Sequence, residues 1–313
     1  MTAGQIRFGV QAAPGTNAQQ WLDLAAKVED LGFDALYVAD HVGVMSSPFP
    51  ALAAAAVATS TLRLGTYVLN CGVRDPLAVA SDTATLDQLS EGRAILGLGA
   101  GHTPGEWTMS GRVYPSARER VGLLVEMIEV VTALLRGDVV THHGTYLHLD
   151  EAVLVEPRPV RAKIPILVGG NGRVLLDYAG RRAEIVGLTG LGRTLADGHQ
   201  HDTDWSQTAI DERVALVRAA ADARRAEERP VLDALVQHVE ITDHRRDAAE
   251  RCAALAPGLT PPDVLGAPYM LIGTVDQLVE EIAEHESRWG ITSYVVCAAA
   301  VDLVAPIIDR LRH

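Results

Sequence analysis

The sequence predicts a single-domain (β/α)8 barrel, and three observations support this fold class. Short apolar runs alternate with longer amphipathic segments along 313 residues, and eight of the runs are typical of strands. Each run is apolar almost throughout, as expected for parallel strands that are covered on both faces. With 48% hydrophobic residues, the chain can bury one large core, and barrels of this length commonly form one domain.

Four strand-and-helix units fit into about the first 110 residues. The helix expected at 17–32 repeats apolar residues at helical spacing and ends on Gly32, which suits a C-terminal cap. The helix expected at 76–92 opens with Pro76, which suits a first helical turn. The expected strands are 6–12, 34–40, 62–70 and 93–101, and the alanine-rich segment 51–59 precedes the third.

The second half alternates less evenly. Four more strands are expected at 164–170, 183–190, 234–243 and 291–299. Amphipathic helices are expected at 115–136, 173–181, 206–226, 274–287 and 303–312. The irregular stretches 138–162 and 191–205 are long enough to be insertions, and long loops in a compact fold commonly serve as lids or binding loops.

Charge and composition exclude several classes of partner. The net charge of −13 disfavours nucleic acid, because phosphate binding relies on clustered Lys and Arg. No apolar run reaches the roughly 18 residues of a membrane span, and the N-terminal segment lacks a basic and apolar leader, so a cytoplasmic location is expected. The cysteines Cys71, Cys252 and Cys297 form no metal-type or disulfide-type spacing, which favours reduced and mostly buried thiols.

The stretch AILGLGAGHTPGE, residues 94–106, does not fit a dinucleotide-binding turn. The motif G-x-G-x-x-G requires a third glycine where this sequence has His102 or Pro104, depending on the register. In a (β/α)8 barrel, functional residues instead follow the C-terminal ends of the strands. Small residues at several of these ends indicate that a flat group, such as a planar cofactor, approaches the backbone. The strand-end positions are Asp40, His41, Asn70 to Arg74, Gly99 to Glu106, Gly169 to Gly172, Thr189 and Gly190.

Five segments occur in an order that resembles the bacterial luciferase-like superfamily, in particular its branch of oxidoreductases that use the deazaflavin coenzyme F420. They are VADHV, LGTYVLNCGVRDPLAVASDTATLDQLSEGRAILGLGAG, GRVYPSARERVGLLVEMIEVV, IPILVGGNG and YMLIGTVDQLVEEIAEHESRWGITSYVV. The resemblance implies a barrel, often dimeric, that holds the cofactor ring at the strand ends. It further implies hydride transfer between F420 and a small-molecule substrate, and so a homodimeric oxidoreductase.

The resemblance also assigns roles to residues in the first half. The pair Asp40-His41 matches an Asp-His pair beside the ring, where His41 polarises the ring or transfers a proton; the alternative is a loop histidine bonded to backbone. A non-prolyl cis peptide that supports the ring is expected at Tyr67-Val68, against an ordinary trans strand. His102 is the second catalytic candidate and stands where relatives that oxidise a sugar phosphate carry a glutamate, which argues against that substrate.

Glycines account for most of the remaining cofactor contacts. Gly99 and Gly101 are expected to leave room for the ring, together with Asn70. The loop Gly169, Gly170, Asn171 and Gly172 is assigned to the cofactor phosphate, because backbone N–H groups and the following helix N-terminus suit an anion; a plain turn is the alternative.

Several charged residues keep two interpretations. Glu106 and Trp107 match a glutamate-aromatic pair of the family, or form a helix-start carboxylate with a packing aromatic. Arg74 faces substrate or cofactor, or forms a surface salt bridge. Arg120 and Glu126 lie inside an expected helix and are interpreted as structural.

The segment GHQHDTDW, residues 198–205, offers His and Asp side chains without a helical metal-ligand spacing, so no metal site is predicted. Two other functions stay open. One is an FMN-dependent monooxygenase on the same barrel, and the other is a non-catalytic barrel that binds flavin or a partner.

Overall fold

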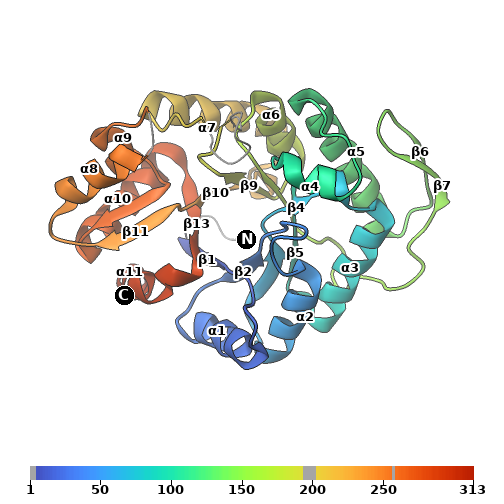
Figure 1. Ribbon diagram of the computed structural model, residues 1–313, viewed down its shortest axis with the longest axis horizontal. Coiled ribbons are helices and arrows are strands. Elements are labelled where there is room, and N and C mark those ends of the chain that lie inside the picture. The colour runs from blue at the N-terminus through green and yellow to red at the C-terminus, as the bar shows by residue number, and fades with distance from the viewer. Residues whose placement is uncertain (1–4, 193–201, 256–257) are drawn as a thin grey trace. The chain divides into compact units, whose positions relative to one another are not determined.

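The structure is a computed structural model that describes residues 5–192, 202–255 and 258–313. Strands and helices alternate along most of the chain (Figure 1). The strands of the main sheet are β1 (Arg7–Gln11), β2 (Ala35–Val38), β3 (Arg63–Thr66), β4 (Leu69–Asn70), β5 (Ala94–Gly99), β8 (Ile166–Gly169), β9 (Ile185–Leu188), β10 (Val231–Leu235) and β13 (Ile291–Cys297). The helices are α1 (Ala18–Asp30), α2 (Pro48–Ala58), α3 (Pro76–Leu89), α4 (Pro104–Met109), α5 (Ala117–Arg136), α6 (Arg173–Arg182), α7 (Gln207–Ala221), α8 (Arg245–Leu255), α9 (Pro261–Gly266), α10 (Val275–Trp289) and α11 (Val301–Arg312).

Within the described ranges, the main sheet has the strand order β3-β2-β1-β13-β10-β9-β8-β5-β4, and an additional pairing joins β3 to β5. This pairing closes a ring of eight strands, and β4 lies outside the ring as a second partner of β5. The closed parallel barrel confirms the predicted fold class. Strands β3 and β4 are the two pieces of the single strand expected at 62–70.

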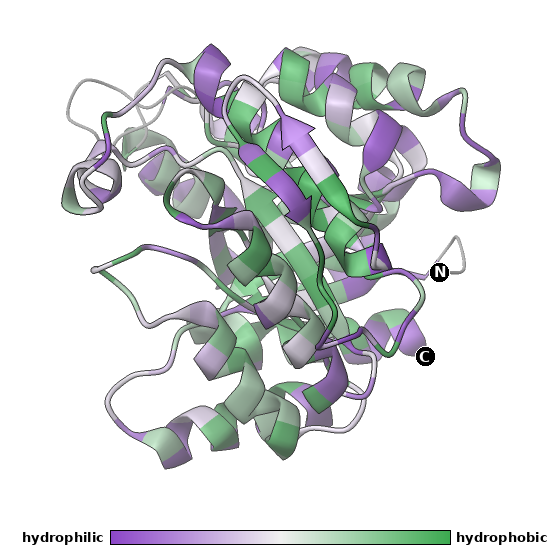
Figure 2. Ribbon diagram, turned by 90° about the vertical axis from the view of Figure 1, so that its right-hand side faces the viewer, coloured by the Kyte–Doolittle hydropathy of each residue, from purple (hydrophilic) through white to green (hydrophobic). Residues whose placement is uncertain are grey.

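The chain divides into two compact units, and the expectation of a single domain stays a prediction. One unit comprises Ala12–Glu29 and Ala35–Val168. In it, β2 pairs with β3, β3 with β5, and β5 with β8, all in parallel. Leucines at Leu36, Leu64 and Leu96 are fully buried, which explains why these strands are apolar at nearly every position (Figure 2).

The other unit comprises the described residues of Met1–Gln11, Asp30–Asp34 and Gly169–His313. Strand β13 pairs in parallel with β1 and β10, and β10 pairs with β9. The rings of Phe8 and Tyr294 stack with centroids 5.7 Å apart in the core of this unit. The C-terminal helices α10 and α11 pack against each other, and both have one apolar face.

The strand expected at 234–243 is two strands. The barrel strand β10 begins three residues earlier, at Val231, and ends at Leu235. The remainder forms β11 (His238–Ile241), which pairs with β12 (Met270–Gly273) in a separate two-stranded sheet. Beyond the break, β11 alternates polar and apolar residues, and both halves of the run have the apolar residues typical of a strand, so the sequence pattern does not separate the two strands. The sequence analysis also missed β12 and the helices α4, α8 and α9.

The expected insertion at 138–162 contains an antiparallel hairpin of β6 (Val140–His143) and β7 (His148–Ala152). Glu126 of α5 anchors its turn, because the carboxylate accepts hydrogen bonds from the backbone N–H groups of Thr145, Tyr146 and Leu147. This contact supports the structural interpretation of Glu126. In the second insertion, 191–205, residues 193–201 lie outside the described ranges.

The cysteines correct one expectation. None of the three forms a disulfide, but only Cys71 is buried, and Cys297 is exposed at the end of β13. The expectation of mostly buried thiols was therefore wrong, because Cys252 is only half-buried on α8 and Cys297 is exposed where β13 ends. No helix in the described part of the chain is long and apolar enough to span a membrane.

Candidate active site

Two side chains, those of His41 and Asn70, meet at the buried carboxylate of Glu106. His41 follows β2, Asn70 ends β4, and Glu106 lies in the first turn of α4, where Pro104 starts the helix directly after β5. Nδ1 of His41 lies 2.6 Å from Oε1 of Glu106, and Nδ2 of Asn70 donates to Oε2 at 2.8 Å. Both carboxylate oxygens are thus engaged. The alternative that His41 is a loop histidine bonded only to backbone is wrong.

The contact between His41 and Glu106 favours a protonated imidazole and an ionised carboxylate. The hydrogen bond with Glu106 raises the pKa of His41 above its ordinary value, while burial acts in the opposite direction. Burial alone would raise the pKa of Glu106, but the hydrogen bonds from His41 and Asn70 outweigh it and lower that pKa. The His41 side chain is 34% exposed and that of Glu106 only 3%. The imidazole of His41 is therefore accessible to solvent, and the buried carboxylate of Glu106 holds it in place.

Asp40, the residue before His41, forms an ion pair with Arg74. Arg74 donates from Nε and Nη2 to the two oxygens of Asp40, at 3.0 and 2.5 Å, and the Asn70 backbone N–H donates at 3.2 Å. Asp40 is buried and Arg74 is partly buried. Arg74 is thus the counterion of a buried carboxylate. Asp40 and Asn70 link the ends of β2 and β4, so Asp40 positions the neighbouring His41.

His102 is exposed and lies next to His41. The centroids of the two imidazole rings are 5.9 Å apart, and the ring planes are nearly perpendicular, at 85°. Tyr114 donates from its hydroxyl to the backbone carbonyl of His102. Position 102 lacks a carboxylate, but Glu106 supplies one four residues later. The site therefore contains a carboxylic acid even though position 102 is a histidine.

The peptide bond between Tyr67 and Val68 is cis, as the resemblance implies. The glycines of β5 pack against this segment. A Cβ on Gly97 would lie 2.0 Å from the carbonyl oxygen of Thr66, one on Gly99 would lie 2.4 Å from Cγ2 of Val68, and one on Gly101 would lie 2.0 Å from Oδ1 of Asn70.

These glycines have a packing reason in the structure, and the expectation that they also leave room for a cofactor ring stays a prediction. The space is filled by β3, β4 and the residues between them, because the two chain segments approach too closely for a side chain. Contact between a cofactor and the backbone at Gly99 or Gly101 stays a prediction.

The loop Gly169 to Gly172 belongs to the other compact unit. Gly172 is the N-cap of α6, and a Cβ there would meet no described atom within 4 Å. Nδ2 of Asn171 donates to the carbonyl of Leu191 at 3.1 Å, whereas its Oδ1 is buried and has no hydrogen-bond partner in the described structure. The loop thus combines open space, a helix N-terminus and one unsatisfied acceptor.

No metal centre emerges from the described residues, which contain no group of three or more His, Cys, Asp or Glu side chains suited to a metal ion. His199 and His201 of the segment 198–205 lie outside the described residues. Trp205 of the same segment is buried and donates from Nε1 to the carbonyl of Gly190 at 2.8 Å.

Comparison with known proteins assigns the family. The profile of the family described as luciferase-like monooxygenase matches residues 2–293. The chain belongs to this family.

Curated relatives of this luciferase-like protein include F420-dependent enzymes. It is 34% identical over 190 residues to a protein named F420-dependent glucose-6-phosphate dehydrogenase from Microbacterium testaceum, a match that covers 57% of this chain and 55% of that relative. The chain therefore matches about half the length of that relative. It is also 25% identical over 321 residues to a 5,10-methylenetetrahydromethanopterin reductase from Archaeoglobus fulgidus, with 98% and 90% of the two chains covered.

A solved structure confirms the fold. The coenzyme F420-dependent tetrahydromethanopterin reductase from Methanopyrus kandleri superposes with a TM-score of 0.78 at 23% identity, covering 98% of this luciferase-like chain and all of that chain. At this identity the similarity concerns the fold alone.

Sequence reasoning named most of the cluster in this luciferase-like protein but missed how it is held together. The Asp40–Arg74 ion pair and the Asn70–Glu106 hydrogen bond join residues 34 and 36 positions apart, a separation at which local spacing gives no signal. Trp107 packs its ring against Gly72, where a Cβ would lie 2.0 Å from the indole. The structure thus confirms a helix-start carboxylate with a packing aromatic, and the match of Glu106 and Trp107 to the family pair stays a prediction.

Proposed function

We propose that this luciferase-like protein is an oxidoreductase that transfers a hydride between coenzyme F420 and a small organic molecule. The names of the curated relatives support this proposal. The observation that carries it is the accessible imidazole of His41 on the buried carboxylate of Glu106, 2.6 Å away, at the end of a barrel strand. This arrangement suits proton handling beside a cofactor that carries the electrons.

The loop from Gly169 to Gly172 has features that suit the hydroxyl groups and the phosphate of a cofactor. The unpartnered and buried Oδ1 of Asn171 would accept from a hydroxyl. The open N-terminus of α6 at Gly172 would receive the phosphate. His41 would lie against the ring. The other proposed cofactor contacts are Asp40, Tyr67, Val68, Asn70, Gly99, Gly101, Glu106, Gly169 and Gly170.

When bound, F420 supplies a two-electron hydride carrier. The chain supplies a proton at a defined atom. Glu106 engages Nδ1 of His41, so Nε2 is the nitrogen that exchanges a proton with a substrate or with the ring. Neutral His41 accepts at Nε2, and protonated His41 donates there. His102, whose ring lies beside that of His41, is proposed as the second proton-handling group.

A fluorescence titration tests the cofactor. Purified apoprotein is titrated with F420 and, separately, with FMN. We expect saturable binding of F420 and much weaker binding of FMN. Preference for FMN, together with oxygen consumption in the presence of reduced flavin, would favour the monooxygenase alternative. Binding of neither would overturn the cofactor proposal.

Variants of the two histidines test catalysis. In a substrate screen with F420, His41→Ala should lower turnover by at least about a hundredfold, the usual contribution of a general acid or base, and His102→Ala by less. Unchanged turnover in both variants would favour the non-catalytic barrel. A cytoplasmic location and a homodimeric assembly stay predictions, to be checked by fractionation and by sedimentation.

A further inference from the structure

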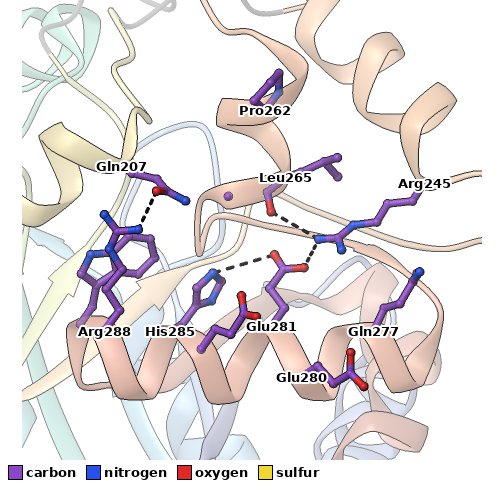
Figure 3. A pocket seen from close by; sticks show the side chains of 12 residues that line it. Gln207, Arg245, Pro262, Leu265, Gln277, Glu280, Glu281, His285 and Arg288 are labelled. Carbon is purple, nitrogen blue, oxygen red and sulfur yellow. Dashed lines mark hydrogen bonds and ion pairs between the residues drawn. The ribbon is translucent and has the colours of Figure 1, made fainter.

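A polar cavity of about 490 Å³ lies among helices α7, α9 and α10, apart from every residue used in the proposed function. Figure 3 shows Glu281 of α10 pointing into it between His285 and Arg245. The volume falls within the range of small-molecule sites, about 300 to 1,000 Å³. All its lining residues belong to one compact unit, so the cavity is described within that unit alone.

Glu281 is a buried carboxylate with one oxygen satisfied and one not. The residue is 6% exposed. Oε2 accepts a hydrogen bond from Nη2 of Arg245, whereas Oε1 has no hydrogen-bond partner in the described structure. A buried unsatisfied acceptor is costly, and it is more so when the acceptor is charged. Oε1 of Glu281 is therefore free to accept a hydrogen bond from a ligand in the cavity.

His285 does not fill that role. Its Nε2 lies 3.9 Å from Oε1 of Glu281, beyond hydrogen-bond distance, and its Nδ1 contacts the hydroxyl of Tyr294 at 3.2 Å. Burial, with a smaller contribution from Arg245, lowers the pKa of His285 to about 4. The imidazole is thus neutral near pH 7 and supplies no positive charge. Burial raises the pKa of Glu281 to about 8, against the opposing effect of Arg245. Without a cation beside it, this carboxyl is therefore largely protonated near pH 7, and an ammonium group bound at Oε1 would displace that proton.

Arg245 has a donor that no described residue uses. Its Nη2 also donates to the carbonyl of Leu265 at 3.3 Å, but its Nε is buried and has no acceptor within the described ranges. Arg288 is already satisfied by Asp211 and Gln207. The cavity therefore offers one free acceptor and one free donor in its buried part.

The rim determines the charge of a suitable ligand. Glu280 and Glu284 line the cavity and are exposed, and neither forms an ion pair with another described residue. Because both arginines already have acidic partners, the remaining charge at the opening is negative. A cationic donor is favoured over a neutral one in this field.

We propose that this cavity is a binding site for a small amino alcohol, whose ammonium group donates to Oε1 of Glu281 and whose hydroxyl accepts from Nε of Arg245. A simple amine has no acceptor for Nε of Arg245. A simple polyol has no positive charge to complement the acidic rim. The inference uses no residue of the proposed hydride-transfer site, so either can fail without the other.

Three matched probes test the proposal by isothermal titration calorimetry in an amine-free buffer. Serinol carries an ammonium group and two hydroxyls, glycerol replaces the ammonium with a hydroxyl, and isopropylamine lacks the hydroxyls. We expect serinol to bind at least about tenfold more tightly than glycerol, as for a charge-assisted hydrogen bond, and more tightly than isopropylamine. Equal binding of serinol and glycerol, or no saturable binding of serinol, would overturn it.

Glu281→Gln locates the binding. It should lose the preference for serinol over glycerol, whereas Glu212→Gln, an exposed carboxylate of α7 outside the cavity, should keep it. Unchanged serinol binding in a folded Glu281→Gln variant would contradict the proposal. If that variant does not fold, Glu284→Gln at the rim is measured instead, and a severalfold loss of serinol affinity with unchanged glycerol affinity is expected; an unchanged ratio would contradict the proposal.

Discussion

Nδ1 of His41 and Oε1 of Glu106 lie 2.6 Å apart, although 65 positions separate the two residues in the chain. The imidazole is partly exposed and the carboxylate is almost completely buried. Because Asn70 occupies the second oxygen of Glu106, the carboxylate cannot rotate away without losing a buried hydrogen bond. The pair therefore fixes the ring of His41 and leaves Nε2 as its exchangeable position.

Removing the charge of Glu106 should lower the pKa of His41. Glu106→Gln preserves the shape of the side chain but removes the anion that stabilises the protonated imidazole. The His41 titration, followed by NMR of the imidazole Cε1–H, should shift to lower pH. Glu129→Gln, at an exposed position of α5, serves as the control and should leave the titration unchanged. A titration that stays in place in Glu106→Gln would contradict this account.

The Asp40–Arg74 pair should be strongly coupled. Arg74→Met leaves a buried carboxylate without its guanidinium, and such a loss costs about 3 kcal/mol of unfolding free energy. Adding Asp40→Asn removes the stranded charge and should recover part of the loss. Urea unfolding of the two single variants and the double variant measures the coupling, and additive effects would show that the pair contributes no specific stability.

Gly97 should not tolerate a side chain. A Cβ there would lie 2.0 Å from the backbone oxygen of Thr66, which cannot move without breaking the pairing of β3. Gly97→Ala should therefore destabilise the fold by about 3 kcal/mol. Gly105→Ala is the matched control, because a Cβ on Gly105 would meet no described atom within 4 Å. It should change the free energy of unfolding by less than about 1 kcal/mol. Similar losses in both variants would refute the packing argument.

Glu29 should make stability depend on pH. Burial opposes its ionisation, but hydrogen bonds from Thr61, Leu62 and Ser60 outweigh burial and lower its pKa to about 2. Since the folded pKa lies below the ordinary value of 4.5, the contribution of Glu29 is full above pH 4.5 and is lost as the pH falls towards 2.

The difference in urea stability between the native chain and Glu29→Gln should accordingly be largest near pH 7 and shrink as the pH falls from 4.5. Glu129→Gln again serves as the control and should differ little from the native chain at any pH. A constant difference for Glu29→Gln between pH 7 and pH 3 would exclude the carboxylate as the source of the pH dependence.

Much of the barrel could be predicted because buried parallel strands have a simple signature. The runs at 6–12, 34–40 and 291–299 became β1, β2 and β13, with ends shifted by one or two residues. The run at 234–243 failed because β10 and the partly exposed β11 follow each other after only two residues, and the change of pairing partner between them depends on strands that are distant in the sequence. The short helices α4 and α9 were missed because six residues are too few to show a helical period.

The candidate site likewise contains residues that the sequence could predict and contacts that it could not. Asp40, His41 and Glu106 could be selected because strand ends collect functional residues in a barrel. Their partners could not be selected, because a hydrogen bond between distant residues depends on how the strands are paired. The packing role of Gly97, Gly99 and Gly101 could not be predicted for the same reason, since the atoms that exclude a side chain there come from another part of the chain.

By itself, the sequence determined the barrel fold class, most of the barrel strands and the long amphipathic helices between them, and the positions at which polar residues follow the strand ends. Local periodicity and the burial of both strand faces are sufficient for these features. Only the tertiary structure decided that Glu106 holds His41, that Arg74 neutralises Asp40, and that Glu281 has an oxygen with no donor. Those properties arise from distances between residues far apart in the chain, and the strength of a hydrogen bond depends on such distances rather than on the order of residues.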